Sequence, residues 1–126
     1  MNYENMTVFE INKAVAETDK KFNSCIDVEF FMSDSNEKAV DVVSQGLLIC
    51  TVDYCNDWAY GGLIIQSKKI SIEYDKSHNT WTAHQGDYLM GKYITNCRYR
   101  HQYESKNPLR AAMIVYLMMN GKQEVK

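Results

Sequence analysis

Apolar residues, with one threonine among them, recur every three or four positions near the start of the chain, at Ile11, Ala14, Val15, Thr18 and Phe22. This period places them on one stripe of a helix. Thr7 and Glu10 precede the stripe at the spacing of a capping box, in which each side chain accepts a hydrogen bond from the other residue's backbone N–H. We therefore predict an amphipathic helix over residues 8–22 that packs on a core by one face.

The next part of the chain has a period of two. Ile26, Val28, Phe30 and Met32 occupy alternate positions, which predicts a half-buried strand. The polar stretch that follows predicts a loop or a short helix. Residues 46–52, with the sequence GLLICTV, form a continuous apolar run, which predicts a strand covered on both faces.

A second alternating segment follows a turn-like stretch at residues 53–57. Apolar and polar residues alternate over 70–74, a turn signal covers 75–79, and alternation resumes over 80–84. This pattern predicts a β-hairpin. Residues 86–106 carry many tyrosines but no strong periodic signal, so we expect a loop there with at most short helical or strand segments.

Residues 107–121 are almost entirely apolar between a clear start and a clear stop. Asn107 is a favourable N-cap, Pro108 suits the first helical position, and Gly121 suits the position after the last turn. A helix of this length that is apolar all round belongs in a core, because it is too short to span a membrane. The elements together predict an α+β fold, formed by a single domain over residues 1–126 with an N-terminal amphipathic helix, a small antiparallel sheet and a buried C-terminal helix.

Composition agrees with a folded cytoplasmic protein, since 45% of the 126 residues are hydrophobic and no secretion signal opens the chain. The net charge of −2 conceals an asymmetry. Residues 1–57 hold eleven acids and four bases, whereas residues 58–126 hold five acids and ten bases. The two halves either attract each other within the fold or present two surfaces of opposite sign.

The four cysteines, Cys25, Cys50, Cys55 and Cys97, lack the paired spacing of a zinc site. We expect free thiols and neither a metal nor a cofactor. The three histidines are scattered, and the sequence contains no phosphate-binding loop, dinucleotide fingerprint or metalloprotease motif. Catalysis is therefore the least favoured class of function.

A basic and aromatic segment near the last helix is a candidate ligand site, comprising Arg98, Tyr99, Arg100, His101 and Arg110. Guanidinium groups pair with phosphates and tyrosines offer stacking faces for bases. The alternative is a solvated basic face that pairs with the acidic half. Arg110 needs an anionic partner, which is either an internal carboxylate or a ligand phosphate.

Trp58 and Tyr60 precede a Gly-Gly pair, a composition that suits a binding loop as well as a plain turn with Trp58 as a lid on the core. A joint site of these aromatics with Arg98, Arg100 and Arg110 requires residues 56–62 to lie near the start of the last helix. That requirement can be checked in the structure.

The segments MTVFEINKAVAE, DYCNDWAYGGLIIQSKKISIEYDKSHNTWTAH and NPLRAAMIVYLMM resemble the NinX-like family of tailed bacteriophages and prophages. The resemblance implies a phage-encoded accessory protein in the cytoplasm of a bacterial host and supplies no catalytic residues. We expect a non-catalytic binding module that acts in counter-defence, either by binding a host or phage protein or by sequestering an anionic nucleotide. The alternative is a nucleic-acid-binding protein of phage recombination or replication, although the net charge argues against strong non-specific DNA binding. We expect no membrane association, and a homodimer is compatible with the sequence.

Overall fold

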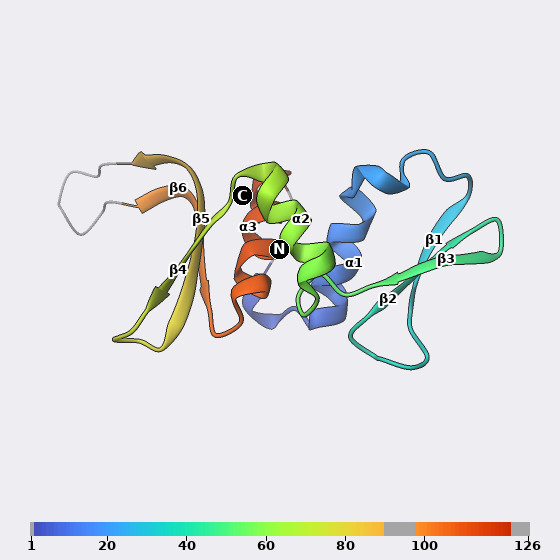
Figure 1. Ribbon diagram of the computed structural model, residues 1–126, viewed down its shortest axis with the longest axis horizontal. Coiled ribbons are helices and arrows are strands. Elements are labelled where there is room, and N and C mark those ends of the chain that lie inside the picture. The colour runs from blue at the N-terminus through green and yellow to red at the C-terminus, as the bar shows by residue number, and fades with distance from the viewer. Residues whose placement is uncertain (1, 90–97, 122–126) are drawn as a thin grey trace.

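The structure of the protein is a computed structural model that describes residues 2–89 and 98–121 (Figure 1). Helices and strands follow one another as η1 (Tyr3–Asn5), α1 (Val8–Thr18), η2 (Lys20–Phe22), β1 (Val28–Met32), β2 (Val40–Ser44), β3 (Leu47–Val52), α2 (Trp58–Lys68), β4 (Ser71–Asp75), β5 (Thr80–Leu89), β6 (Arg98–Ser105) and α3 (Pro108–Met119). The strands form two antiparallel sheets, sheet A in the order β1-β2-β3 and sheet B in the order β4-β5-β6. The α+β prediction is confirmed, with two small sheets in place of one.

The C-terminal helix α3 is the centre of the molecule. Residues 111–115 and Leu117 are fully buried, and α3 packs against sheet B on one side and α1 and α2 on the other (Figure 1). Its start is fixed by the Asn107 side chain, which accepts hydrogen bonds from the N–H groups of Leu109 at 2.9 Å and Arg110 at 3.2 Å. Gly121 ends it with a φ of 74°. The prediction of a buried C-terminal core helix is confirmed.

The N-terminal helix begins with the predicted capping box. Thr7 Oγ1 accepts from the N–H of Glu10 at 3.1 Å, and Glu10 Oε1 accepts from the N–H of Thr7 at 2.7 Å. The helix stops at Thr18, because Asp19 is extended (φ −74°, ψ 118°). The predicted helix 8–22 is therefore α1 followed by the single turn η2. Among the described residues, no helix has the length and apolar character needed to cross a membrane.

The prediction that residues 46–52 form a strand covered on both faces is wrong. These residues form β3, an edge strand whose Leu47, Leu48 and Ile49 side chains are 73%, 61% and 46% exposed. Sheet A projects from the helices as an arm, and its main contacts with α1 are made by β1 and β2 (Figure 1). Burial of β3 by the helices is therefore limited to the base of the arm, where Val52 is fully buried.

The binding loop or turn expected over residues 56–62 is instead, from Trp58 onward, the start of helix α2. Asp57 caps this helix by accepting from the N–H of Ala59 at 2.9 Å. Gly61 allows close packing, because a Cβ at this position would lie 2.4 Å from the carbonyl oxygen of Tyr54. The β-hairpin prediction is confirmed by β4 and β5, and the tyrosine-rich segment that follows contains strand β6.

Candidate anion-binding groove

The structure meets the requirement that residues 56–62 lie beside the start of the last helix. Asn107 Nδ2 donates to the carbonyl oxygen of Cys55 at 2.9 Å, and a Cβ on Gly61 would lie 2.9 Å from Cδ2 of Leu109. Trp58 is 56% exposed, so it is not a lid on the core. Tyr60, two residues further on, is half-buried with its ring edge-on to that of Tyr54 at 6.2 Å between centroids.

Arg110 lies on this first turn of α3, but its guanidinium group is used inside the protein. Its Nη2 donates to the carbonyl oxygens of Tyr3 at 3.1 Å and Met6 at 2.9 Å. The internal partner considered from the sequence exists, although it consists of two carbonyl groups and not a carboxylate. Arg110 thereby ties the N-terminal segment to α3.

The other predicted residues lie on β6, at the outer end of sheet B and away from α2 (Figure 1). Exposed Arg100 is 3.5 Å from Asp87, and the Tyr99 ring stacks on His84 with 3.7 Å between centroids. His101 is half-buried, and burial together with the charge of Arg100 lowers its pKa. The side chain of Arg98 lies outside the described part of the structure. The fold thus places Trp58, Tyr60 and Arg110 in one region and the β6 residues in another.

Tyr60 faces a different set of cations, which the sequence reasoning missed. The lysine groove, as we name it, runs between η2 and α2 and is lined by Lys20, Lys21, Tyr60, Ser67, Lys68 and Lys69. A hollow of about 510 Å³ contains Lys21, Tyr60 and Lys69, and an adjoining hollow of about 280 Å³ contains Lys20 and Lys68. Both hollows share Asp19, Ile64 and Ser67. The signal in the sequence was a Lys-Lys pair occurring twice, at 20–21 and 68–69.

Local structure explains why the two lysine pairs meet. Asp19 ends α1 and caps η2 by accepting from the N–H of Lys21 at 3.2 Å, which fixes the first pair in a tight turn. The second pair closes α2, where Lys69 has left-handed backbone geometry with a φ of 57°. Cations at the carboxyl end of a helix interact favourably with its dipole.

The charge of the lysine groove is positive overall, because Asp19 is the single acid among its lining residues. That carboxylate is engaged by the Tyr54 hydroxyl, which donates to Oδ2 at 2.7 Å. Burial and this hydrogen bond to Asp19 raise the pKa of Tyr54, so the hydroxyl keeps its proton. Lys21 Nζ lies 3.8 Å from Asp19 and 4.5 Å from the centre of the Tyr60 ring. The groove therefore offers lysine ammonium groups, the hydroxyl of Ser67 and the aromatic face of Tyr60.

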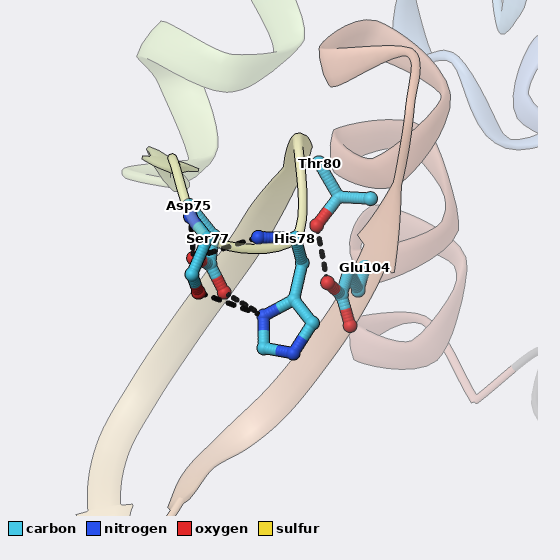
Figure 2. A network of polar contacts seen from close by, with 5 residues as sticks. All are labelled: Asp75, Ser77, His78, Thr80 and Glu104. Carbon is cyan, nitrogen blue, oxygen red and sulfur yellow. Dashed lines mark hydrogen bonds and ion pairs between the residues drawn. The ribbon is translucent and has the colours of Figure 1, made fainter.

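A second polar cluster lies at the β4–β5 turn (Figure 2). Asp75, His78 and Glu104 are the one group of three metal-ligand side chains found among the described residues, with ligand atoms within 4.8 Å of one another. They already have neighbours as partners, since Asp75 accepts from Ser77 and lies 2.6 Å from His78 Nδ1, and Glu104 accepts from Thr80. We assign this cluster to stabilising the hairpin. The cysteines within the described residues, Cys25, Cys50 and Cys55, are free thiols.

Comparison with known proteins identifies a family. The family described as Bacteriophage P22, NinX matches residues 2–120, nearly the whole chain. No curated protein and no solved structure matches the sequence. Because the match extends from the first 3-10 turn to the end of α3, it includes both sheets and the lysine groove. The chain belongs to the bacteriophage P22 NinX family.

Proposed function

We propose that the protein is a phage-encoded binding module that holds an anionic ligand of the nucleotide class in the lysine groove. The observation that carries this proposal is the convergence of four lysines and Tyr60 on two adjoining hollows. Lysine ammonium groups bind phosphate oxygens as point charges, and an aromatic ring offers a stacking face to a base. The larger hollow, at about 510 Å³, falls within the size range of ligand pockets.

Sequestration is the form of action that suits this groove. A ligand held there is neutralised by several ammonium groups, and the carboxylate of the groove, Asp19, is already engaged by the Tyr54 hydroxyl and Lys21. In a phage protein, lowering the free concentration of a host signalling nucleotide would blunt host defence. Tyr60 retains its role from the sequence hypothesis, whereas lysines take the place of the β6 arginines.

A thermal-shift titration tests the proposal. We expect nucleoside triphosphates and pyrophosphate to raise the melting temperature as their concentration increases, and nucleosides without phosphate to have little effect. The double variant Lys21→Ala, Lys69→Ala should lose this response. The double variant Lys13→Ala, Lys76→Ala removes the same charge outside the groove and should respond like the wild type.

Two outcomes would count against the proposal. One is equal stabilisation of the groove variant and the wild type, and the other is no stabilisation by any nucleotide up to millimolar concentration. The second candidate function, binding of a single nucleic-acid strand, is favoured by the adjacency of the two hollows, along which successive phosphates could lie. Tight binding of single-stranded oligonucleotides with a steep salt dependence, and weak binding of mononucleotides, would select it.

A further inference from the structure

The outer edge of β3 differs from the other sheet edges of the described structure in carrying no charged side chain. The three other edge strands carry Glu29 on β1, Glu73 and Asp75 on β4, and Arg100 and Glu104 on β6. Natural proteins protect sheet edges with charges, prolines, bulges or covering elements, because an open edge presents unpaired N–H and C=O groups to another strand. Strand β3 also has no proline. Its edge is therefore the least protected of the four.

The exposure of the apolar side chains of β3 increases from the base of sheet A to its tip. Val52 is fully buried, Ile49 is 46% exposed, and Leu47 is 73% exposed. Ile26, at the same end of the sheet, is 61% exposed. In Figure 1 this end of the arm lies farthest from the helices. Large apolar side chains gathered at an uncovered end are typical of an interaction surface.

One protective feature is present, a β-bulge at Ile49. Val42 pairs with Cys50 and Val43 pairs with Leu48, so Ile49 is the extra residue in the ladder between β2 and β3. The bulge bends the strand locally. It leaves the residues on either side of Ile49 extended and exposed or half-buried, so it does not remove the edge as a pairing surface.

We propose that β3 pairs antiparallel with β3 of a second copy of the chain, joining two copies of sheet A into one six-stranded sheet across a twofold axis. This contact is isologous, because the same surface is used by both copies, and such interfaces close on themselves as dimers. Backbone hydrogen bonds would satisfy the open edge, and the leucines at the tip would be covered by their counterparts. The proposal is independent of the lysine groove and uses a different surface.

Charge does not oppose this pairing, although the first half of the chain is acidic. Two acids flank β3, and both have partners: Asp53, directly after the strand, accepts a hydrogen bond from Asn12 Nδ2 at 2.7 Å, and Asp41 on β2 accepts one from Thr51 Oγ1 at 2.6 Å. In the dimer the two Asp41 residues would be separated by three strand spacings, roughly 14 Å. That separation exceeds the Debye length of about 8 Å at physiological salt, so their repulsion is largely screened. A basic strand from another protein would gain little attraction from Asp41, because that charge is also largely screened. An uncharged strand, such as β3 of a second copy, matches the uncharged edge better.

The area buried in the seam between the two β3 strands determines the expected affinity of the dimer. A stable interface of standard size buries about 800 Å² on each partner, and a six-residue strand with three exposed apolar side chains provides less than that. We therefore expect a reversible dimer with a dissociation constant on the order of 10 µM, which corresponds to roughly −7 kcal/mol.

Sedimentation velocity over a concentration range that spans this value tests the proposal. The wild type should change from monomer to dimer as its concentration rises. Leu48→Lys should remain monomeric, since it places a charge in the seam at a side chain that is 61% exposed. Leu63→Lys makes the same change on α2, at a side chain that is 59% exposed, and should dimerise like the wild type.

Hydrogen exchange locates the contact independently of any variant. Amides of residues 47–52 should exchange more slowly at high than at low protein concentration. A wild type that stays monomeric throughout the range would overturn the proposal, as would a dimer that Leu48→Lys leaves intact or whose protection lies on another element. If Leu48→Lys does not fold, Ile49→Lys makes the same test at the bulge, and a dimer that survives it would equally refute the seam.

Discussion

Sheets A and B each have three antiparallel strands, but they are attached to the molecule differently. All three strands of sheet B pack against the central helix α3, whereas sheet A contacts α1 through β1 and β2. The consequence is visible in the side chains. Each sheet has fully buried residues in its middle strand, Ala83 in sheet B and Val40 and Val42 in sheet A, but sheet A also ends in a tip where Leu47 is 73% exposed.

This difference indicates what each sheet contributes. Apolar residues of sheet B contact a buried helix, so packing explains their presence. The apolar residues at the tip of sheet A contact no such helix, although exposing them to water is unfavourable and invites aggregation. A role in recognition explains them better than a role in the monomer's stability. Sheet B is therefore part of the core, as is the base of sheet A through Val40, Val42 and Val52, whereas we propose that the tip of sheet A is a surface for assembly.

The largest effect that tests this comparison is a charge placed in each region. Met113 on α3 is fully buried, so Met113→Asp would leave an unpaired charge in the core. Such a charge costs several kcal/mol against a total stability of roughly 5–15 kcal/mol. We expect loss of the cooperative unfolding transition, measured by circular dichroism during urea denaturation.

Leu47→Asp is the matched change at the tip of sheet A, and we expect it to alter the free energy of unfolding by at most about 0.5 kcal/mol. A Met113→Asp protein with wild-type melting behaviour would mean that α3 is not the core. A Leu47→Asp protein that fails to fold would mean that the tip belongs to the core after all.

The parts of the fold that could be predicted from sequence are those with local end signals. The capping box of Thr7 and Glu10 and the Asn107-Pro108 start of α3 each fix a helix through residues only a few positions apart. The exposure of β3 could not be predicted. An apolar run indicates that a strand can be buried, but it does not show whether another element packs on it. Helix α2 was missed since its glycines favour a loop locally, and it is the tertiary packing of Gly61 against Tyr54 that accommodates them.

The candidate site shows the same limit. The sequence indicated Tyr60 as an aromatic ligand contact, and the structure places it in the lysine groove. The cations were assigned to the β6 arginines because those residues are close together in sequence. In sequence, all of sheet A and most of α2 lie between the lysine pairs 20–21 and 68–69, and the fold brings them together where η2 lies beside α2.

A second, smaller effect is expected at the joint that holds sheet A to the helices. Asn12 is a fully buried residue of α1 whose Nδ2 donates to the carbonyl oxygen of Lys38 at 2.8 Å and to Asp53 at 2.7 Å. Its Oδ1 accepts from the N–H of Cys55 at 3.0 Å. Asn12→Ala leaves these partners unsatisfied, which we expect to cost about 2–3 kcal/mol in the free energy of unfolding.

Urea denaturation measures this loss, and hydrogen exchange shows where it falls. The amides of β2 and β3 should become less protected than those of β5, because Asn12 bonds to the segments flanking sheet A. Asn23→Ala, at an exposed asparagine, is the control and should unfold like the wild type. Equal loss of amide protection in both sheets would show that the hydrogen bonds of Asn12 stabilise the whole fold and not sheet A in particular.

The smallest effect is expected at the β4–β5 turn of sheet B, where His78 and Asp75 pair (Figure 2). Hydrogen bonds from Ser77 and His78 lower the pKa of Asp75 to about 2, and Asp75 raises the pKa of His78. A raised histidine pKa stabilises the fold below the unfolded value of about 6.5, and this stabilisation is lost as the pH rises through the folded pKa. A lowered aspartate pKa stabilises it above about 3.9, and this part is lost as the pH falls through about 2.

The pair therefore contributes most between about pH 4 and 6.5, and the contribution is small because His78 is exposed and Asp75 is partly exposed. We expect His78→Asn to lower the melting temperature slightly at pH 5 and not at pH 9. NMR titration provides the direct measurement, with His101 as the internal reference because burial lowers its pKa. His78 should titrate at a higher pH than His101. The reverse order would show that the turn is not held by this pair, and that sheet B depends on α3 alone.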